Sequence, residues 1–128
     1  MTCKTTKGVK VSIKPHYEGN YFSNEGNIDV FTYDVIIENN TDYTIKLLKR
    51  HWYILDAADY ACEVEGSGVV GEQPILCPGD SHYYQSGSHL KSPIGSMKGD
   101  YLFKRMVDDS VFKVEIPQFQ LLAPFVGN

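Results

Sequence analysis

Residues 31–42 read FTYDVIIENNTD, and this stretch decides the fold class. Every second residue is apolar, at Phe31, Tyr33, Val35 and Ile37, which is the period of a strand with one buried face. The polar residues that follow have the composition of a turn. The stretch therefore predicts a β-strand that packs on a core and then reverses direction.

The segments on either side of this stretch show similar patterns. Residues 9–14, VKVSIK, alternate in the same way and predict a first strand. Residues 45–56, IKLLKRHWYILD, are ambiguous, because some of their apolar residues also fit a helical stripe. We predict a strand here, since the neighbouring elements are all β. The alternating set is Leu48, Arg50, Trp52 and Ile54.

Turn residues and short apolar runs predict the rest of the chain. We predict a polar loop at residues 18–27, irregular chain with at most short strand pieces at 65–80, and another loop at 86–97. We predict strands at 82–85, at 98–106 and 111–116 as a hairpin around residues 107–110, and at 119–123 between Pro117 and Pro124. About seven strands at this spacing indicate an all-β antiparallel sandwich. Without a repeat or a linker, residues 1–128 are predicted to form one domain.

The composition is that of an ordinary soluble globule, with 42% apolar and 22% charged residues. The net charge of −4 gives no general attraction to nucleic acid or to anionic membranes. Three cysteines without CxxC spacing suggest neither a disulfide framework nor a zinc site, and they favour a reducing compartment. Residues 1–19 lack the apolar region of a signal peptide, and no apolar run approaches the ~20 residues that span a bilayer. We expect a cytoplasmic protein.

The sequence carries no recognisable catalytic or metal-binding motif. It has no GxSxG elbow, no context that would activate a cysteine, and no carboxylate pair that strand geometry would bring together. The four histidines, His16, His51, His82 and His89, show no paired spacing of metal ligands. We therefore expect no catalytic residue, no metal and no cofactor. Nine tyrosines exceed what a small core consumes, and exposed aromatic rings favour a partner surface.

Residues 66–71, GSGVVG, match the GxGxxG pattern of dinucleotide-binding folds. Pro74 and Pro78 follow at once and exclude the helix that such a site requires, so this interpretation is rejected. A glycine loop with a structural role is the favoured alternative, in which Arg50 stacks on Trp52 or pairs with a carboxylate. The other alternative is an anion or nucleotide site. Its residues would be Gly66, Ser67, Gly68, Gly71 and Arg50.

Five segments, taken in order, resemble the ApaG family. Residues 48–56 resemble an LxRxWxIxD block, and residues 64–74 resemble a VxGxGVVGxQP block. The further blocks are LCPG at 76–79, residues 86–101 from SGS to PIGSMKGDY, and FKVEIPQF at 112–119. The resemblance covers about residues 9–124.

The resemblance implies a sandwich of the immunoglobulin or fibronectin type III kind and explains the glycine motif as a family loop. Bacterial members are encoded beside a diadenosine-tetraphosphate hydrolase and are linked to cobalt and magnesium tolerance. Similar domains in an F-box substrate receptor and a polymerase-interacting protein serve protein contact, and pyrophosphate binding by the glycine loop has been suggested. The family offers no catalytic residues.

Two functional hypotheses follow. The first is a non-enzymatic module that binds a protein partner through exposed aromatics, loops or a sheet edge. The second is a binder of a nucleotide or pyrophosphate at residues 66–71 with Arg50. A metal-dependent enzyme is a distant third, and self-association through open sheet edges remains an option.

Overall fold

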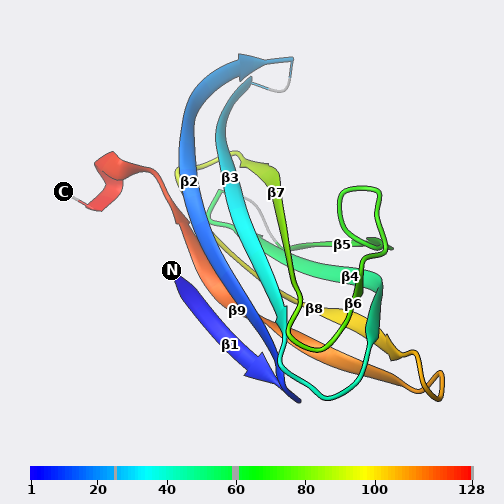
Figure 1. Cartoon of the computed structure of the whole chain (residues 1–128). Helices are drawn as coiled ribbons and strands as arrows, with labels where there is room; N and C mark the ends of the chain where they lie inside the picture. Colours follow the sequence, from blue (N-terminus) through cyan, green and yellow to red (C-terminus); the bar gives the residue numbers. More distant parts are fainter. Residues whose placement is uncertain (25, 59–60, 128) are drawn as a thin grey trace.

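A computed structural model describes residues 1–24, 26–58 and 61–127, and these form nine β-strands and one short 3₁₀ helix. The elements are β1 (Thr2–Thr6), β2 (Val9–Ser23), β3 (Gly26–Asn39), β4 (Ile45–Asp56), β5 (Cys62–Ser67), β6 (Ile75–Leu76), β7 (Ser81–Leu90), β8 (Ile94–Arg105), β9 (Val111–Leu122) and η1 (Pro124–Gly127). One sheet has the order β1-β2-β3-β7, and the other has the order β5-β4-β8-β9 with β6 also paired to β4 (Figure 1). Every described pairing is antiparallel, so the predicted all-β antiparallel sandwich is confirmed.

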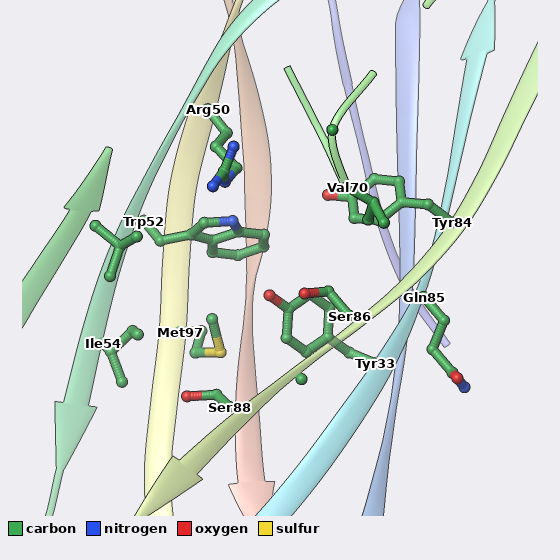
Figure 2. Close-up of a pocket in the computed structure, with 13 residues that line it drawn as sticks. Tyr33, Arg50, Trp52, Ile54, Val70, Tyr84, Gln85, Ser86, Ser88 and Met97 are labelled. Atoms are coloured by element: carbon green, nitrogen blue, oxygen red, sulfur yellow. The ribbon is translucent and has the colours of Figure 1, made fainter. Parts of the chain in front are cut away.

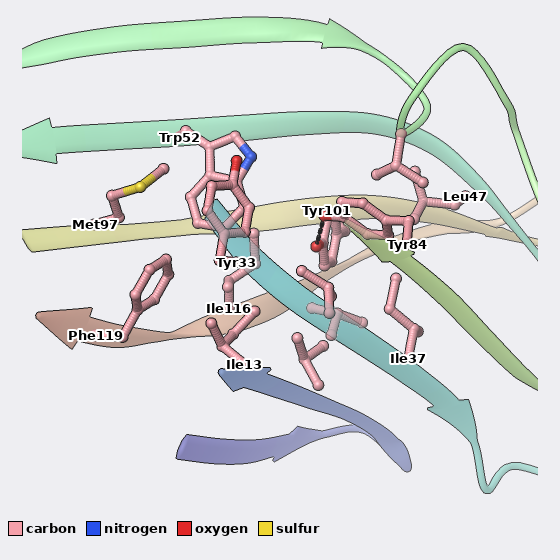
Figure 3. Packing of buried hydrophobic residues seen from close by; sticks show 14 of the residues in the cluster. Ile13, Tyr33, Ile37, Leu47, Trp52, Tyr84, Met97, Tyr101, Ile116 and Phe119 are labelled. Atoms are coloured by element: carbon pink, nitrogen blue, oxygen red, sulfur yellow. Dashed lines mark hydrogen bonds between the residues drawn. The ribbon is translucent and has the colours of Figure 1, made fainter. Parts of the chain in front are cut away.

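The core lies between the two sheets and follows the alternation of the strands. The apolar residues of β3 that alternate in the sequence are all buried, and Val9, Val11 and Ile13 of β2 are fully inaccessible. Tyr101 of β8 meets them from the opposite sheet (Figure 3), and Phe103 of the same strand belongs to the same buried cluster. Full burial of such a side chain contributes about 1.5–3 kcal/mol, so this shared layer holds the sheets together.

The ambiguous segment at residues 45–56 is strand β4, as predicted. Its alternation is broken once, because the register with β8 shifts between Leu47 and Lys49. Leu47 is therefore fully buried in place of Leu48, while Arg50 and Trp52 still share the inner face. This bulge sets which side chains of β4 point between the sheets.

The loop predicted at residues 18–27 is wrong, because β2 continues to Ser23 and β3 begins at Gly26. The two strands form a long hairpin that extends past the other strands (Figure 1). Its outer part has no second sheet to cover it, so even Tyr21 and Phe22 are exposed there and the sequence shows no alternation. Glu25 lies outside the described residues.

The loop predicted at residues 86–97 is also wrong. β7 continues to Leu90, and β8 begins at Ile94 after a three-residue connection. The serines and glycine at 86–88 belong to an edge strand that faces a cleft, so they carry no apolar signal. The consequence is a ten-residue edge strand where a short aromatic one was expected.

The separate strand predicted at residues 119–123 is part of β9, which runs through Pro117 without a break. Opposite β8, the register of β9 shifts between Ile116 and Phe119, so Pro117 lies in a bulge. β9 is an edge strand, where a missing backbone N–H is tolerated. The hairpin predicted at 98–106 and 111–116 is confirmed. β1 was not predicted.

The two long sides of the sandwich differ. On one side β1 lies against β9, where Lys4 forms an ion pair with Glu115 and the Glu115 amide donates to Thr6 Oγ1 at 3.2 Å. On the other side β7 and β5 are the edges, and a cleft opens between the sheets. The fold is therefore closed along one side and open along the other.

Candidate functional site

The cleft on the open side is the candidate site, and we call it the inter-sheet cleft. It has a volume of about 350 Å³. Its walls come from β3 and β7 on one side and from β4, β5, β8 and the loop after β5 on the other (Figure 2). The lining residues are Tyr33, Arg50, Trp52, Ile54, Val64, Val70, Gly71, Tyr84, Gln85, Ser86, Gly87, Ser88 and Met97.

Arg50 reaches the cleft from the inner face of β4. Its Nη1 donates to the backbone carbonyls of Ser67 and Gly68, both at 3.0 Å. The guanidinium lies flat on Gly66, where an added Cβ would come within 2.7 Å of it. The prediction that Arg50 stacks on Trp52 or pairs with a carboxylate is therefore wrong. β5 pairs with β4 opposite Arg50 and brings these carbonyls within its reach.

Only part of the guanidinium is used in this way. Nε and Nη2 of Arg50 have no protein partner among the described residues, and neither is a buried unpaired atom. The side chain is partly exposed. Arg50 thus holds the end of β5 and the following loop through Nη1, and its Nε and Nη2 can donate to a group in the cleft.

Trp52 forms the floor next to Arg50 and is only 3% exposed. Its ring packs against Tyr33 at a centroid distance of 5.4 Å and against the edge of Phe119 at 6.0 Å. The indole N–H lies on the ring edge that faces Arg50 (Figure 2), makes no hydrogen bond within the described residues and is not a buried unpaired atom, so it is open to solvent in the cleft. This N–H is therefore available to donate to an acceptor group of a ligand that enters the cleft.

Tyrosine and serine hydroxyls form the opposite wall. The Ser86 side chain hydrogen-bonds the Tyr33 hydroxyl, and the Tyr84 and Tyr101 hydroxyls bond each other. Burial raises the pKa of Tyr33 and of Tyr84, while the positive charge of Arg50 offsets only part of the effect. These phenols therefore stay neutral at physiological pH and present O–H groups. Ser88 adds a further hydroxyl to the lining.

The electrostatic character of the cleft follows from its lining. Of the thirteen lining residues, Arg50 is the one with a charged side chain. The remaining polar groups are mainly hydroxyls and the indole N–H, all of which can donate. Chemically, the cleft suits a ligand that carries one negative charge and several acceptor atoms.

The glycine loop borders the cleft but uses some of its amides internally. The Gly68 amide donates to the Leu48 carbonyl at 2.8 Å, and Val69 and Glu72 exchange two backbone bonds of 2.8 and 3.0 Å. Val70 and Gly71 between them both have positive φ, 48° and 76°, as a tight hairpin turn requires.

The structure thus brings Arg50 to Gly66, Ser67 and Gly68, as the anion hypothesis expected, and places Gly71 on the cleft wall. However, the guanidinium faces carbonyl oxygens, and the Gly68 amide is already bonded. Anion binding by these residues stays a prediction. As donors for an anion, the unbonded nitrogens of Arg50 that face the cleft are better placed than the amides of the glycine loop.

The four histidines lie in separate environments. His16 bonds Asp34 on the outer face of the first sheet, and His51 contacts Glu63 at 3.0 Å and Glu65 at 2.9 Å on the outer face of the second. His82 and His89 lie on β7. Within the described ranges, no group of three or more His, Cys, Asp or Glu residues is placed to hold a metal ion. No helix in this part of the chain is long and apolar enough to cross a membrane.

Sequence reasoning found Arg50 but missed the wall that faces it. The alternation indicates Tyr33 only as a core residue, and the composition of residues 86–97 predicts a loop that contains Ser86 and Ser88. Their sole signal was the register of β7 on β3, which sets Ser86 opposite Tyr33 and Ser88 opposite Phe31. Such a register cannot be read from one strand alone.

Fold and cleft together define a small all-β domain with a positively charged, donor-lined cleft between its sheets. The family model described as ApaG domain matches residues 20–105. The chain belongs to the ApaG domain family.

Relatives and solved structures support this assignment. The chain is 44% identical over 124 residues to Protein ApaG of Paramagnetospirillum magneticum and equally to that of Brucella canis, covering 97% of this chain and 95% of each relative. The crystal structure of a putative ApaA protein from Bordetella pertussis is similar at 37% identity and a TM-score of 0.82, over 91% of this chain and 94% of that one. A structural-genomics target solved by X-ray methods is similar at 35% identity and a TM-score of 0.86, over 91% and 88% of the two chains.

Proposed function

We propose that this protein is a non-enzymatic binding module that engages a partner protein through the free edge of β7. One observation carries the proposal: β7 is a ten-residue edge strand without a charged residue or a proline. Edge strands normally carry such residues, because an unprotected edge pairs with other chains. Among the other described edge strands, β1, β5 and β9 each carry at least one charged residue, and β6, which carries none, is only two residues long.

Other features of β7 favour strand addition by a partner. Its outward face carries Tyr83, which is 60% exposed, and its other face borders the inter-sheet cleft. A partner strand paired to β7 would form backbone hydrogen bonds along the edge and could place a side chain over the cleft. Tyr83 and Gln85 both donate to Asp34, which keeps β7 firmly on β3.

The absence of catalysis is part of the proposal. The buried carboxylates have structural partners: Asp29 accepts from Tyr17 at 2.8 Å, and Asp56 accepts from the Lys91 amide at 2.6 Å and from Ser92 at 2.8 Å. These bonds support a role in holding turns and strands. Cys3, Cys62 and Cys77 are free and exposed, which fits a reducing, cytoplasmic compartment.

The test uses a displayed random-peptide library selected against the immobilised protein. Enriched peptides are resynthesised, titrated, and mapped by the amide resonances that they shift. We expect micromolar binding with shifts concentrated on β7. The double variant Tyr83→Lys/His89→Lys should abolish binding, because charge blocks strand addition.

The matched control is Gln118→Lys/Gln120→Lys, which makes similar charge changes on exposed positions of β9. It should bind as the wild type does. Peptides that map away from β7, or equal loss in both double variants, would show that the edge is not the binding surface.

A further inference from the structure

The inter-sheet cleft has unused binding capacity that strand addition at β7 does not explain. Two kinds of donor converge there without a protein partner: the indole N–H of Trp52 and the Nε and Nη2 groups of Arg50. The Trp52 side chain is 97% buried, but its N–H is not a buried unpaired atom and is therefore open to water or to a ligand from the cleft. The structural role of Arg50 uses only Nη1, which bonds the carbonyls of Ser67 and Gly68. The other two nitrogens remain available for a ligand.

We propose that this cleft binds an aromatic monocarboxylate, with the carboxylate on Arg50 and Trp52 and the apolar body against the aromatic wall. A carboxylate supplies two oxygens with four lone pairs, which matches a guanidinium face and an adjacent N–H. The hydroxyls of Ser86 and Ser88 lie across the cleft and complete the polar lining.

The single charge of the lining selects the charge of the ligand. One arginine can neutralise one carboxylate, whereas a pyrophosphate or nucleoside triphosphate would bring several negative charges to a site without a second cation among its lining residues. The cleft therefore discriminates against the polyanions that the glycine motif suggests. The expected ligand therefore differs from the pyrophosphate or nucleotide that would bind the backbone amides of residues 66–71.

The apolar part of the lining selects the body of the ligand. Tyr33, Trp52 and Tyr84 present ring surfaces, and Ile54 and Met97 close the base (Figure 2). A volume of about 350 Å³ is at the small end of ligand pockets, so one ring with a short acidic side chain is the appropriate size. Aromatic faces prefer offset or edge-on contact with such a ring.

The test uses Trp52 itself, because it is the single tryptophan of the chain and its emission reports directly on the cleft. The purified protein is titrated with 3-phenylpropanoate and, separately, with its neutral amide 3-phenylpropanamide. We expect saturable quenching by the acid, with a dissociation constant in the high-micromolar to low-millimolar range for a ligand of about ten heavy atoms. The amide should bind at least tenfold more weakly.

Two variants and one control locate the binding. Arg50→Met should weaken the acid about 10- to 100-fold, the range for hydrogen bonds to a charged group. Gly66→Ala should also weaken it, because the new Cβ overlaps the guanidinium and displaces a flexible side chain while the fold is kept. Lys49→Met removes the neighbouring positive charge from the exposed face of β4 and should leave the affinity unchanged.

Further probes distinguish the source of the carboxylate. Pyrophosphate should not change the emission of Trp52. Glycyl-phenylalanine with a free carboxylate tests a peptide C-terminus: tighter binding than the free acid assigns the cleft to a chain end, and weaker binding assigns it to a small acid. Equal binding of acid and amide, tighter binding of pyrophosphate, or equal loss in Lys49→Met would overturn the proposal. Because these tests need no β7 variant, their failure is independent of the proposed edge interaction.

Discussion

Asn39→Asp tests whether one buried amide holds the end of the sandwich together. Asn39 is 0% exposed at the end of β3, and its Nδ2 donates to the carbonyls of Tyr43 at 2.9 Å and Leu76 at 3.0 Å. Its Oδ1 accepts from the amide and hydroxyl of Thr41 at 3.0 and 2.6 Å. One side chain thus links the β3–β4 turn to β6.

The substitution keeps the shape and the acceptor but removes both donors. The Leu76 carbonyl loses its side-chain donor, whereas the Tyr43 carbonyl keeps the Thr41 hydroxyl at 3.0 Å. One buried carbonyl left without its donor costs about 1–3 kcal/mol, which is the loss expected. This is a sizeable part of the 5–15 kcal/mol that stabilises a typical domain. The new carboxylate oxygen would also face two carbonyl oxygens, which adds repulsion.

The loss should depend on pH in a definite direction. Burial and the facing carbonyls raise the pKa of the new carboxyl in the folded state above the value of about 3.9 in the unfolded chain. Protonation restores one donor, so the deficit is smallest below about pH 4 and grows as pH rises through the folded pKa.

The assay is urea unfolding followed by Trp52 fluorescence at pH 7.5 and pH 4.5. Asn40→Asp is the matched control, because Asn40 is adjacent and exposed, and it should change stability by less than about 0.5 kcal/mol. A loss below about 1 kcal/mol for Asn39→Asp, or a loss that does not shrink at pH 4.5, would refute the reasoning, since the donor lost at the Leu76 carbonyl alone predicts at least that much.

Two further predictions concern Asp34 and the glycine loop. Hydrogen bonds from Tyr83 and His16 lower the pKa of the Asp34 carboxyl, so its stabilising effect is present above about pH 4 and is lost as pH falls through the lowered value. The stability gap between wild type and Asp34→Asn in urea titrations should therefore close on acidification. Gly68 has φ of +59°, and an added Cβ would lie 1.9 Å from a backbone oxygen, so Gly68→Ala should cost more than about 2 kcal/mol. Gly71→Ala meets nothing within 4 Å and should cost only about 1–2 kcal/mol by the same assay; equal losses would contradict the contact.

The open and closed sides of the sandwich explain how the two proposals relate. Along the closed side, β1 and β9 contact each other through the Lys4–Glu115 ion pair and the hydrogen bond of the Glu115 amide to Thr6. Along the open side, the free edge of β7 and the inter-sheet cleft lie next to each other. A strand on the edge and an acid in the cleft would use different atoms, so each can be tested without the other.

Local alternation predicted the covered strands well. Residues 9–14 and 31–37 have one face on the core, and burial of that face imposes the two-residue period on the sequence. The outer part of the β2–β3 hairpin and residues 86–88 of β7 lack such a cover, so nothing in their composition separates them from loops. The same limit hid the bulges at Leu48 and Pro117, which depend on the partner strand.

Some features of the candidate site could likewise be predicted from the sequence, and others depended on the tertiary structure. The sequence by itself determined the sandwich class, the place of Arg50 and Trp52 on one strand face, and the absence of a helix after the glycine motif. Only the tertiary structure decided that Arg50 bonds two carbonyls from β5 and its loop, and that Ser86 stands opposite Tyr33. The physical reason is that these contacts join residues from different strands, and their meeting depends on register and sheet packing, which no single segment encodes.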